Sequence, residues 1–202
     1  MRIHCSRTAC RAGLTVSFAF LCWPSQAAAH LVTTGLGPVY DGIGHLLMTP
    51  DDLVPVLALA LFAGLRGATS GRRALFFLPL AWLTGGLAGL MLQGLPAFPV
   101  PALSFLVMGA LVAADLRMEA RGITVLAVGL GLVHGFLNGA VLQQGPGALG
   151  LIGIMATLFV IVALVSAFVV SLRRPWTRIV VRVAGSWIVA SGILMLGWAF
   201  RG

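Results

Sequence analysis

The side chains able to bind a cation lie in two short stretches of this sequence. His45 precedes the acidic pair Asp51 and Asp52, and His134 lies four residues before Asn138. Imidazole nitrogens favour nickel, cobalt, copper and zinc ions, whereas carboxylates neutralise the charge of a bound ion. These residue types and their grouping therefore predict a binding site for a divalent transition metal.

Two simpler interpretations of the same residues stay open. Thr49, Pro50 and the two aspartates form a good helix start, with an N-cap, a proline at the first position and acids in the first turn. A lone histidine in an apolar helix, such as His134, is more often a hydrogen-bonded packing residue than a ligand. The helix start does not account for His45, and the number of such groups favours a cation site.

The first 29 residues have the pattern of a secretory signal peptide. Three arginines precede an apolar run of 11 residues at 13–23, and alanines at 27–29 offer a cleavage site. Cleavage after Ala29 would expose His30, whose α-amine and imidazole can chelate one metal ion. The alternative is an uncleaved first helix that anchors the chain. All three cysteines lie in this segment, so the mature chain would lack thiolate ligands.

The composition is that of a membrane protein. Of the 202 residues, 59% are hydrophobic and only 9% are charged, whereas a soluble domain is about 45–50% apolar and about 25% charged. This balance excludes a disordered chain, a nucleic-acid-binding protein and a disulfide scaffold. All 13 basic residues are arginines, placed in short clusters between apolar runs as in polytopic membrane proteins.

Six apolar segments follow the leader, at residues 50–65, 74–92, 100–116, 122–142, 148–172 and 179–200. Most reach the ~20 residues that a helix needs to cross ~30 Å of hydrocarbon, although the first is short. Helices are expected because a spanning chain must satisfy its own backbone hydrogen bonds. We therefore predict an all-α polytopic membrane helix bundle, with a cleaved signal peptide at 1–29 and six transmembrane helices within 30–202.

The arginines predict the orientation of these helices. Nine of them lie after the first, third and fifth segments, at positions 66, 72, 73, 117, 121, 173, 174, 178 and 182. The connections after the second and fourth segments carry no charge. By the positive-inside rule the arginine-rich connections are cytoplasmic, so both mature termini are predicted to be periplasmic in a bacterial inner membrane.

Two further groups of residues have structural interpretations. Gly131, Gly135 and Gly139 recur at every fourth position of one segment, which predicts a face where helices pack closely. Asp115 and Glu119 lie among arginines at a predicted cytoplasmic end, which favours a solvated turn with local ion pairs.

Three stretches together resemble the HupE/UreJ family of hydrogenase and urease accessory permeases. His45, five residues, then Asp51 and Asp52 are similar to a family motif that enters the first helix. Residues 71–81 look like the start of its second helix, and residues 133–139 look like a fourth-helix His-Gly-x-x-His-Gly pattern. In this sequence Asp52 and Asn138 stand where the family pattern has histidine.

The resemblance implies a six-helix permease with a cleaved leader and a nickel or cobalt substrate. We expect six side chains to handle the metal, four capturing it on the periplasmic side and two passing it inward: His30, His45, Asp51 and Asp52, then His134 and Asn138. His45 and Asp51 are expected to have the central roles. Ni²⁺ or Co²⁺ is the expected substrate, with Cu²⁺ and Zn²⁺ also compatible with the ligands.

A second hypothesis is a non-transporting membrane subunit, or a metal-delivery module, of a larger membrane complex. The glycine-rich faces and short connections fit it equally well. Under either hypothesis the expected partners are membrane lipid, a metal ion and, in some assemblies, further copies of the chain, but no nucleic acid. No recognised hydrolase motif is present in the sequence, so we predict that the chain is not an enzyme.

Overall fold

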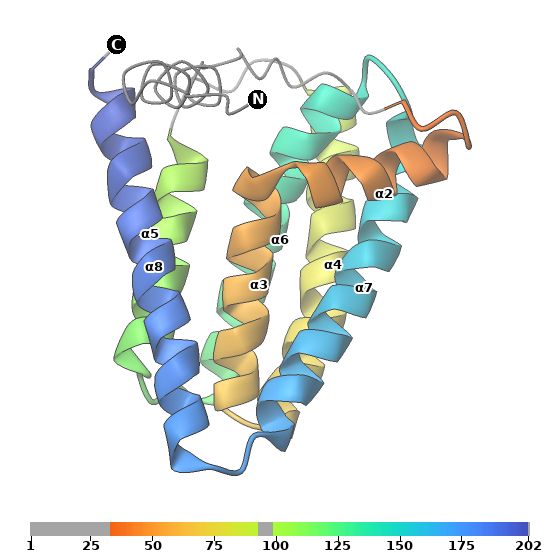
Figure 1. Ribbon diagram of the computed structural model, residues 1–202. Helices are drawn as coiled ribbons and strands as arrows, with labels where there is room; N and C mark the ends of the chain where they lie inside the picture. The colour runs from red at the N-terminus through yellow and green to blue at the C-terminus, as the bar shows by residue number, and fades with distance from the viewer. Residues whose placement is uncertain (1–32, 93–98, 202) are drawn as a thin grey trace, which may run out of the picture. The chain divides into compact units, whose positions relative to one another are not determined.

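The computed structural model describes residues 33–92 and 99–201, and these ranges contain seven helices and no strand (Figure 1). The helices are α2 (Pro38–Met48), α3 (Pro50–Leu65), α4 (Ala68–Met91), α5 (Val100–Ala114), α6 (Ala120–Leu142), α7 (Gly147–Ser171) and α8 (Pro175–Ala199). The chain divides into units 1–30 and 31–202. The predicted signal peptide, His30 and the three cysteines lie outside the described residues.

Helices α3 to α8 run alternately in opposite directions, and α2 lies across one end of them (Figure 1). The closest packing joins α4 to α6 and α5 to α8, while α7 packs on α2, α3 and α4. The all-helical class is confirmed, and the six predicted segments correspond to α3–α8. The structure adds α2, which the sequence analysis did not predict.

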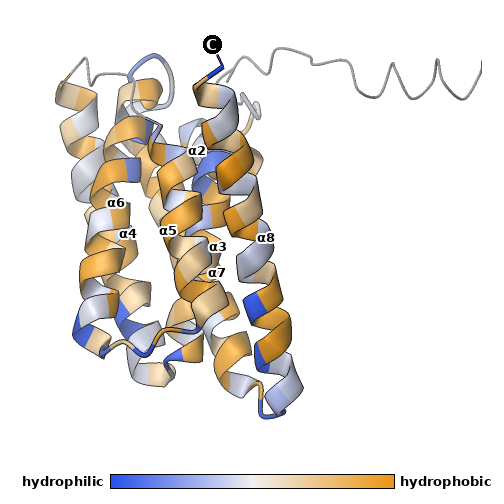
Figure 2. Cartoon of the chain, turned by 90° about the vertical axis from the view of Figure 1, so that its left-hand side faces the viewer, coloured by the Kyte–Doolittle hydropathy of each residue, from blue (hydrophilic) through white to orange (hydrophobic). Residues whose placement is uncertain are grey.

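The number of membrane spans is only partly settled by helix length. Four helices, α4, α6, α7 and α8, are long and apolar enough to cross a membrane. A fifth candidate is the pair α2 and α3, which is bent by 76° at its break. Helix α5, with 15 residues, is a shorter apolar helix. Six spans therefore stay a prediction for the described residues. Hydrophobic residues predominate along the helices of the bundle (Figure 2).

The break between α2 and α3 follows from Pro50. Proline disfavours helical geometry in the residue before it, and Thr49 is extended with φ −106° and ψ 91°. Pro50 then begins α3 as predicted, but the Thr49 hydroxyl does not cap that helix. It donates instead to the His45 carbonyl oxygen of α2, 2.7 Å away. The break therefore sets α2 across the first turn of α3.

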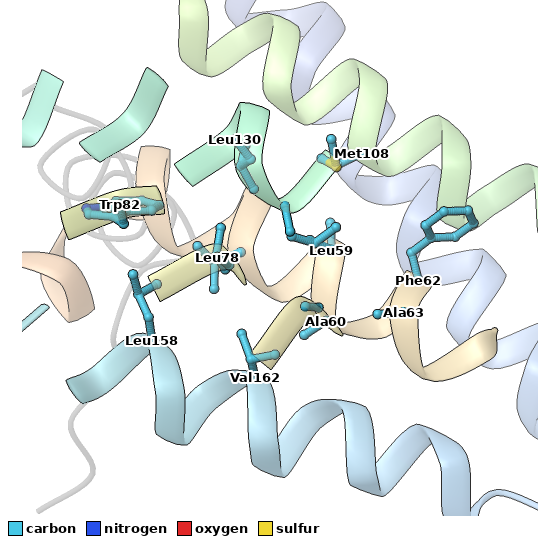
Figure 3. Packing of buried hydrophobic residues seen from close by; sticks show 14 of the residues in the cluster. Leu59, Ala60, Phe62, Ala63, Leu78, Trp82, Met108, Leu130, Leu158 and Val162 are labelled. Carbon is cyan, nitrogen blue, oxygen red and sulfur yellow. The ribbon is translucent and has the colours of Figure 1, made fainter. Parts of the chain in front are cut away.

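The predicted glycine face is confirmed as the contact of α6 with α4. A Cβ atom on Gly131, Gly135 or Gly139 would strike the α4 backbone, including the carbonyl oxygens of Trp82 and Gly86. With no side chain between them, the two helices approach within backbone contact. Around this contact lies a core of large apolar side chains, several of which Figure 3 shows: Leu59, Phe62, Leu78, Trp82 and Leu158.

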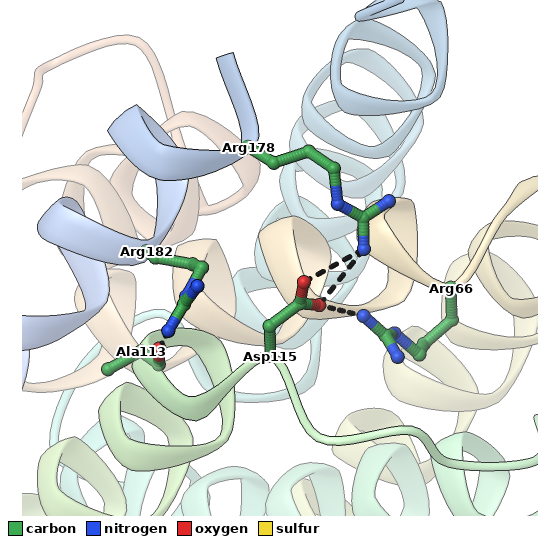
Figure 4. Close-up of polar contacts among 5 residues, drawn as sticks. All are labelled: Arg66, Ala113, Asp115, Arg178 and Arg182. Carbon is green, nitrogen blue, oxygen red and sulfur yellow. Dashed lines mark hydrogen bonds and ion pairs between the residues drawn. The ribbon is translucent and has the colours of Figure 1, made fainter. Parts of the chain in front are cut away.

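The three connections rich in arginine gather at one end of the bundle, which we call the arginine end. Asp115, after α5, accepts hydrogen bonds from Arg66, after α3, and from Arg178 of α8 (Figure 4). The expectation of local ion pairs was wrong here, because both partners are distant in sequence. Asp115 also has a left-handed backbone, with φ 50°, which turns the chain out of α5.

Candidate functional site

Three buried polar side chains meet near the end of the bundle opposite the arginine end. Asp52, His134 and Asn138 are 6%, 1% and 3% exposed. His134 Nδ1 lies 2.7 Å from Asp52 Oδ1, and Asn138 Nδ2 donates to Asp52 Oδ2 over 2.8 Å. His134 Nε2 lies 2.8 Å from the hydroxyl of Ser104. We call these four residues the polar cluster.

Four helices position these side chains and the ring beside them. Asp52 lies in the first turn of α3, where the helix dipole favours a carboxylate. His134 and Asn138 lie one turn apart on the same face of α6, and Ser104 comes from α5. The Trp82 ring of α4 lies over His134, with centroids 5.6 Å apart and planes inclined at 31°.

The hydrogen bonds fix the form of the imidazole. An ionised carboxylate only accepts hydrogen bonds, so Nδ1 of His134 carries hydrogen toward Asp52. In the neutral ring Nε2 then has a lone pair, and the Ser104 hydroxyl donates to it. Asp52 therefore holds His134 with Nε2, the nitrogen able to bind a metal, directed toward α5.

Two polar atoms beside the cluster have no hydrogen-bond partner among the described residues, Asn138 Oδ1 and Trp82 Nε1. The His45 ring of α2 has Asn138 and Asp52 as polar neighbours, and His45 is itself buried. Both Asn138 amide hydrogens are used, toward Asp52 and the His134 carbonyl oxygen. Asn138 Oδ1 thus forms no hydrogen bond of ordinary geometry but interacts with the His45 ring, and the two groups are candidate donors for a cation.

A cavity gives access to the cluster from the side of the bundle. Its volume is about 430 Å³, and it is lined by α5 and α6, with Ser104 and His134 in its wall. The other lining residues are apolar, apart from the glycine of α6: Val100, Leu103, Val107, Met108, Val125, Leu126, Gly129, Leu130 and Val133. Helices α5 and α6 pack little on each other, which leaves this space between them.

The structure brings together four of the six predicted site residues. Asp52, His134 and Asn138 are in direct contact, and His45 lies beside them. Asp51 is exposed and makes no hydrogen bond with the cluster, although its carboxylate is near enough to Asp52 and His134 to interact with their charges. The sequence analysis assigned Asp52 to capture and His134 to a later step, whereas the two touch. In residues 33–92 and 99–201 no three His, Cys, Asp or Glu side chains are grouped closely enough to hold a metal ion.

Ser104 and Trp82 were missed by the sequence analysis. Both lie inside predicted membrane segments, where a hydroxyl or an indole is unremarkable, and no local pattern marks them. Only the packing of α4, α5 and α6 sets these side chains against His134. For Ser104 alone the sequence offered a weak signal, because it is the one hydroxyl residue in the apolar run 100–114.

The cluster can act on a cation or on a hydroxyl group. Carboxylate, imidazole and hydroxyl follow each other as in serine hydrolases. However, Ser104 and His134 lie within α5 and α6, so their own backbone N–H groups bond along the helix and are not available to an oxyanion. The arrangement is better suited to metal ligation, in which a carboxylate orients a ligating histidine.

Comparison with known proteins agrees with the motif resemblance. A model of the HupE / UreJ protein family matches residues 18–195, which is most of the chain. No curated protein and no solved structure matches it. The matched range includes the first turn of α3 and all of α6, which together supply Asp52, His134 and Asn138. The chain therefore belongs to the HupE/UreJ family.

Proposed function

We propose that this chain is a permease for a divalent transition metal ion, Ni²⁺ or Co²⁺, in a bacterial inner membrane. The observation that carries the proposal is the buried Asp52–His134 pair, set with Asn138 inside an apolar helical bundle. Polar groups at such places are costly and commonly mark an ion path. Membership of a family associated with nickel or cobalt uptake and accessory roles supports the same function.

Each member of the cluster has a separate task in this proposal. Asp52 keeps His134 in the tautomer whose Nε2 has the lone pair, and holds the ring in a fixed orientation. The Ser104 hydroxyl bonds to Nε2 until a metal ion replaces it. Asn138 Oδ1 and the ring of His45 are the further donors. A set of imidazole and oxygen donors suits Ni²⁺ and Co²⁺.

The cluster lies at the end of the bundle opposite the arginines. By the positive-inside rule the arginines face the cytoplasm, so the cluster lies toward the periplasm in this proposal. His30 and the exposed Asp51 then supply the first contacts for the ion before it reaches the buried residues. This order assigns capture to the outer groups and inward passage to His134 and Asn138. Both ends of the mature chain are periplasmic in this orientation.

The second candidate is a membrane subunit that does not itself transport metal. One observation favours it, since the described residues hold no group of three His, Cys, Asp or Glu side chains for an ion. Such a subunit would need a partner chain to complete the coordination. Purification with a stoichiometric partner, together with no metal flux in vesicles of the purified chain, would support this function instead.

The test is metal accumulation by cells that express the chain, measured by mass spectrometry of the washed cells. We expect His134→Gln to lower nickel or cobalt accumulation about tenfold or more, because it removes the imidazole ligand while keeping a polar side chain. Ser186→Ala on α8 is the control, since this exposed hydroxyl bonds only to its own helix. Equal amounts of both proteins in the membrane make the comparison valid. Wild-type accumulation by His134→Gln would refute the assignment.

A further inference from the structure

A second site, unrelated to the polar cluster, lies in the groove between α4 and α7 at the arginine end. A cavity of about 460 Å³ opens there, with Arg72 of α4 and Arg173, which follows α7, in its wall. No acidic side chain lines this cavity. Within the described ranges neither guanidinium forms an ion pair. The positive charge of the groove is therefore free to bind an anion.

The serines of the groove do not compete for that role. The Ser166 hydroxyl donates to the Val162 carbonyl oxygen and the Ser171 hydroxyl to the Phe168 carbonyl oxygen, both within α7. At Gly71 helix α4 approaches α7 closely, because a Cβ there would lie 3.2 Å from the Ser166 hydroxyl oxygen. The two arginines are thus the donors that would bind an anionic group.

Farther along the same two helices, away from the arginine end, lies an apolar surface cavity. This second cavity, of about 540 Å³, is lined only by apolar side chains of α4 and α7: Phe76, Pro79, Leu80, Met155, Ala156, Phe159 and Val160. Residues 72, 76 and 80 lie one turn apart on α4, and residues 156, 160, 163 and 167 follow one face of α7. The two cavities therefore belong to one strip along the contact of these neighbouring helices (Figure 1).

We propose that this groove binds one anionic phospholipid, with its phosphate on Arg72 and Arg173 and an acyl chain along the apolar strip. Arg72 and Leu80 are about 12 Å apart along the helix axis, most of the ~15 Å of hydrocarbon in one leaflet. Basic pockets between helices on the cytoplasmic side are suited to anionic headgroups. A free phosphate ion would satisfy the arginines but would leave the apolar strip uncovered.

The test measures lipid binding by the purified full-length chain, using native mass spectrometry and thermal unfolding in mild detergent. The probes are phosphatidylglycerol, phosphatidylcholine and sodium phosphate, each added separately. We expect phosphatidylglycerol to bind one molecule per chain and to raise Tm more than phosphatidylcholine. Arg72→Gln with Arg173→Gln should weaken that binding by about fivefold per arginine.

Two further variants make the result specific. Arg117→Gln with Arg121→Gln removes the same charge from the same end of the bundle but outside the groove, and should leave phosphatidylglycerol binding unchanged. Ala167→Phe keeps both arginines and fills the groove, and should weaken binding of the lipid. Equal binding of both lipids, wild-type binding by the Arg72 and Arg173 variant, or an equal effect of phosphate alone would overturn the proposal.

Discussion

Asp51 and Asp52 are chemically alike, yet a step of one residue along the helix gives them different surroundings. Successive helical residues point about 100° apart, so only one of the two can face His134. The structure assigns that position to Asp52, which is buried, and leaves Asp51 exposed. Adjacent positions in the helix thus give one carboxylate that orients the His134 ring and one that is exposed.

The first prediction at this scale compares the two carboxylates directly. Asp52→Asn should weaken metal binding by about 10- to 100-fold, because the amide cannot fix the His134 tautomer as the carboxylate does. Asp51→Asn, the same substitution at the adjacent position, should change the affinity for the metal ion by less than about threefold. Titration calorimetry of the purified chain with Ni²⁺ and Co²⁺ measures both. A larger loss in Asp51→Asn would return the central role to that residue.

A second prediction for a single residue concerns Asp115, which forms an ion pair with Arg66 at the arginine end. The Arg66 side chain is 8% exposed, so Asp115→Asn leaves a nearly buried guanidinium without its counter-charge. Breaking a buried pair lowers the free energy of unfolding by about 3–5 kcal/mol. Because Asp115 is partly exposed, we expect the Asp115→Asn variant to lose about 2 kcal/mol. Glu119→Gln, at an exposed position, should change the free energy of unfolding by less than about 0.5 kcal/mol. Thermal unfolding in detergent would distinguish them, and equal midpoints would contradict the structural role.

At the scale of elements, the long helices were predictable and the short one was not. Apolar runs located both ends of α3, α5, α6 and α7 to within two residues, whereas α8 begins four residues before its apolar run. Helix α4 begins six residues earlier than its apolar run, because Arg72 and Arg73 interrupt the hydropathy but not the helix. Helix α2 has 11 residues and contains glycine, Asp41 and His45, so no apolar run marks it.

The glycine face gives the prediction at this scale. Gly135→Ala should lower stability by about 1–3 kcal/mol, because its new methyl group would strike the Trp82 carbonyl oxygen of α4. Gly129→Ala places the same methyl group on the same helix with no atom in its way, and should be neutral or slightly stabilising. Thermal unfolding of the two variants provides the comparison. Similar Tm values would show that the helices are not held in backbone contact.

For the whole molecule, the sequence predicted which ends lie together but not which side chains meet. Alternating charged and uncharged connections were sufficient to place three arginine clusters at one end. The cluster around His134 required α3 to pack on both α5 and α6, and hydropathy carries no information on which helix faces touch. Thus Ser104 was missed, and Asp52 was separated from its partner His134.

The orientation of the molecule can be tested directly. In a chain whose three native cysteines are replaced by serine, Gly145→Cys should react with an impermeant maleimide added to intact spheroplasts. Arg174→Cys, at the arginine end, should react only after lysis. The reverse pattern would place the polar cluster toward the cytoplasm and the lipid groove toward the periplasm.

The closest packing in the bundle forms two helix pairs, which α3 connects and which have a division between them where α5 faces α6. Helices α4 and α6 are joined through their backbones, α5 is joined to α8, and α5 has little contact with α6. The hydrogen bond from Ser104 to His134 crosses that division. If the two pairs move apart, as the halves of some transporters do, this bond breaks and Nε2 is uncovered. Opening of the bundle would then release His134 Nε2 from the Ser104 hydroxyl, and the same motion would make this nitrogen available to a metal ion.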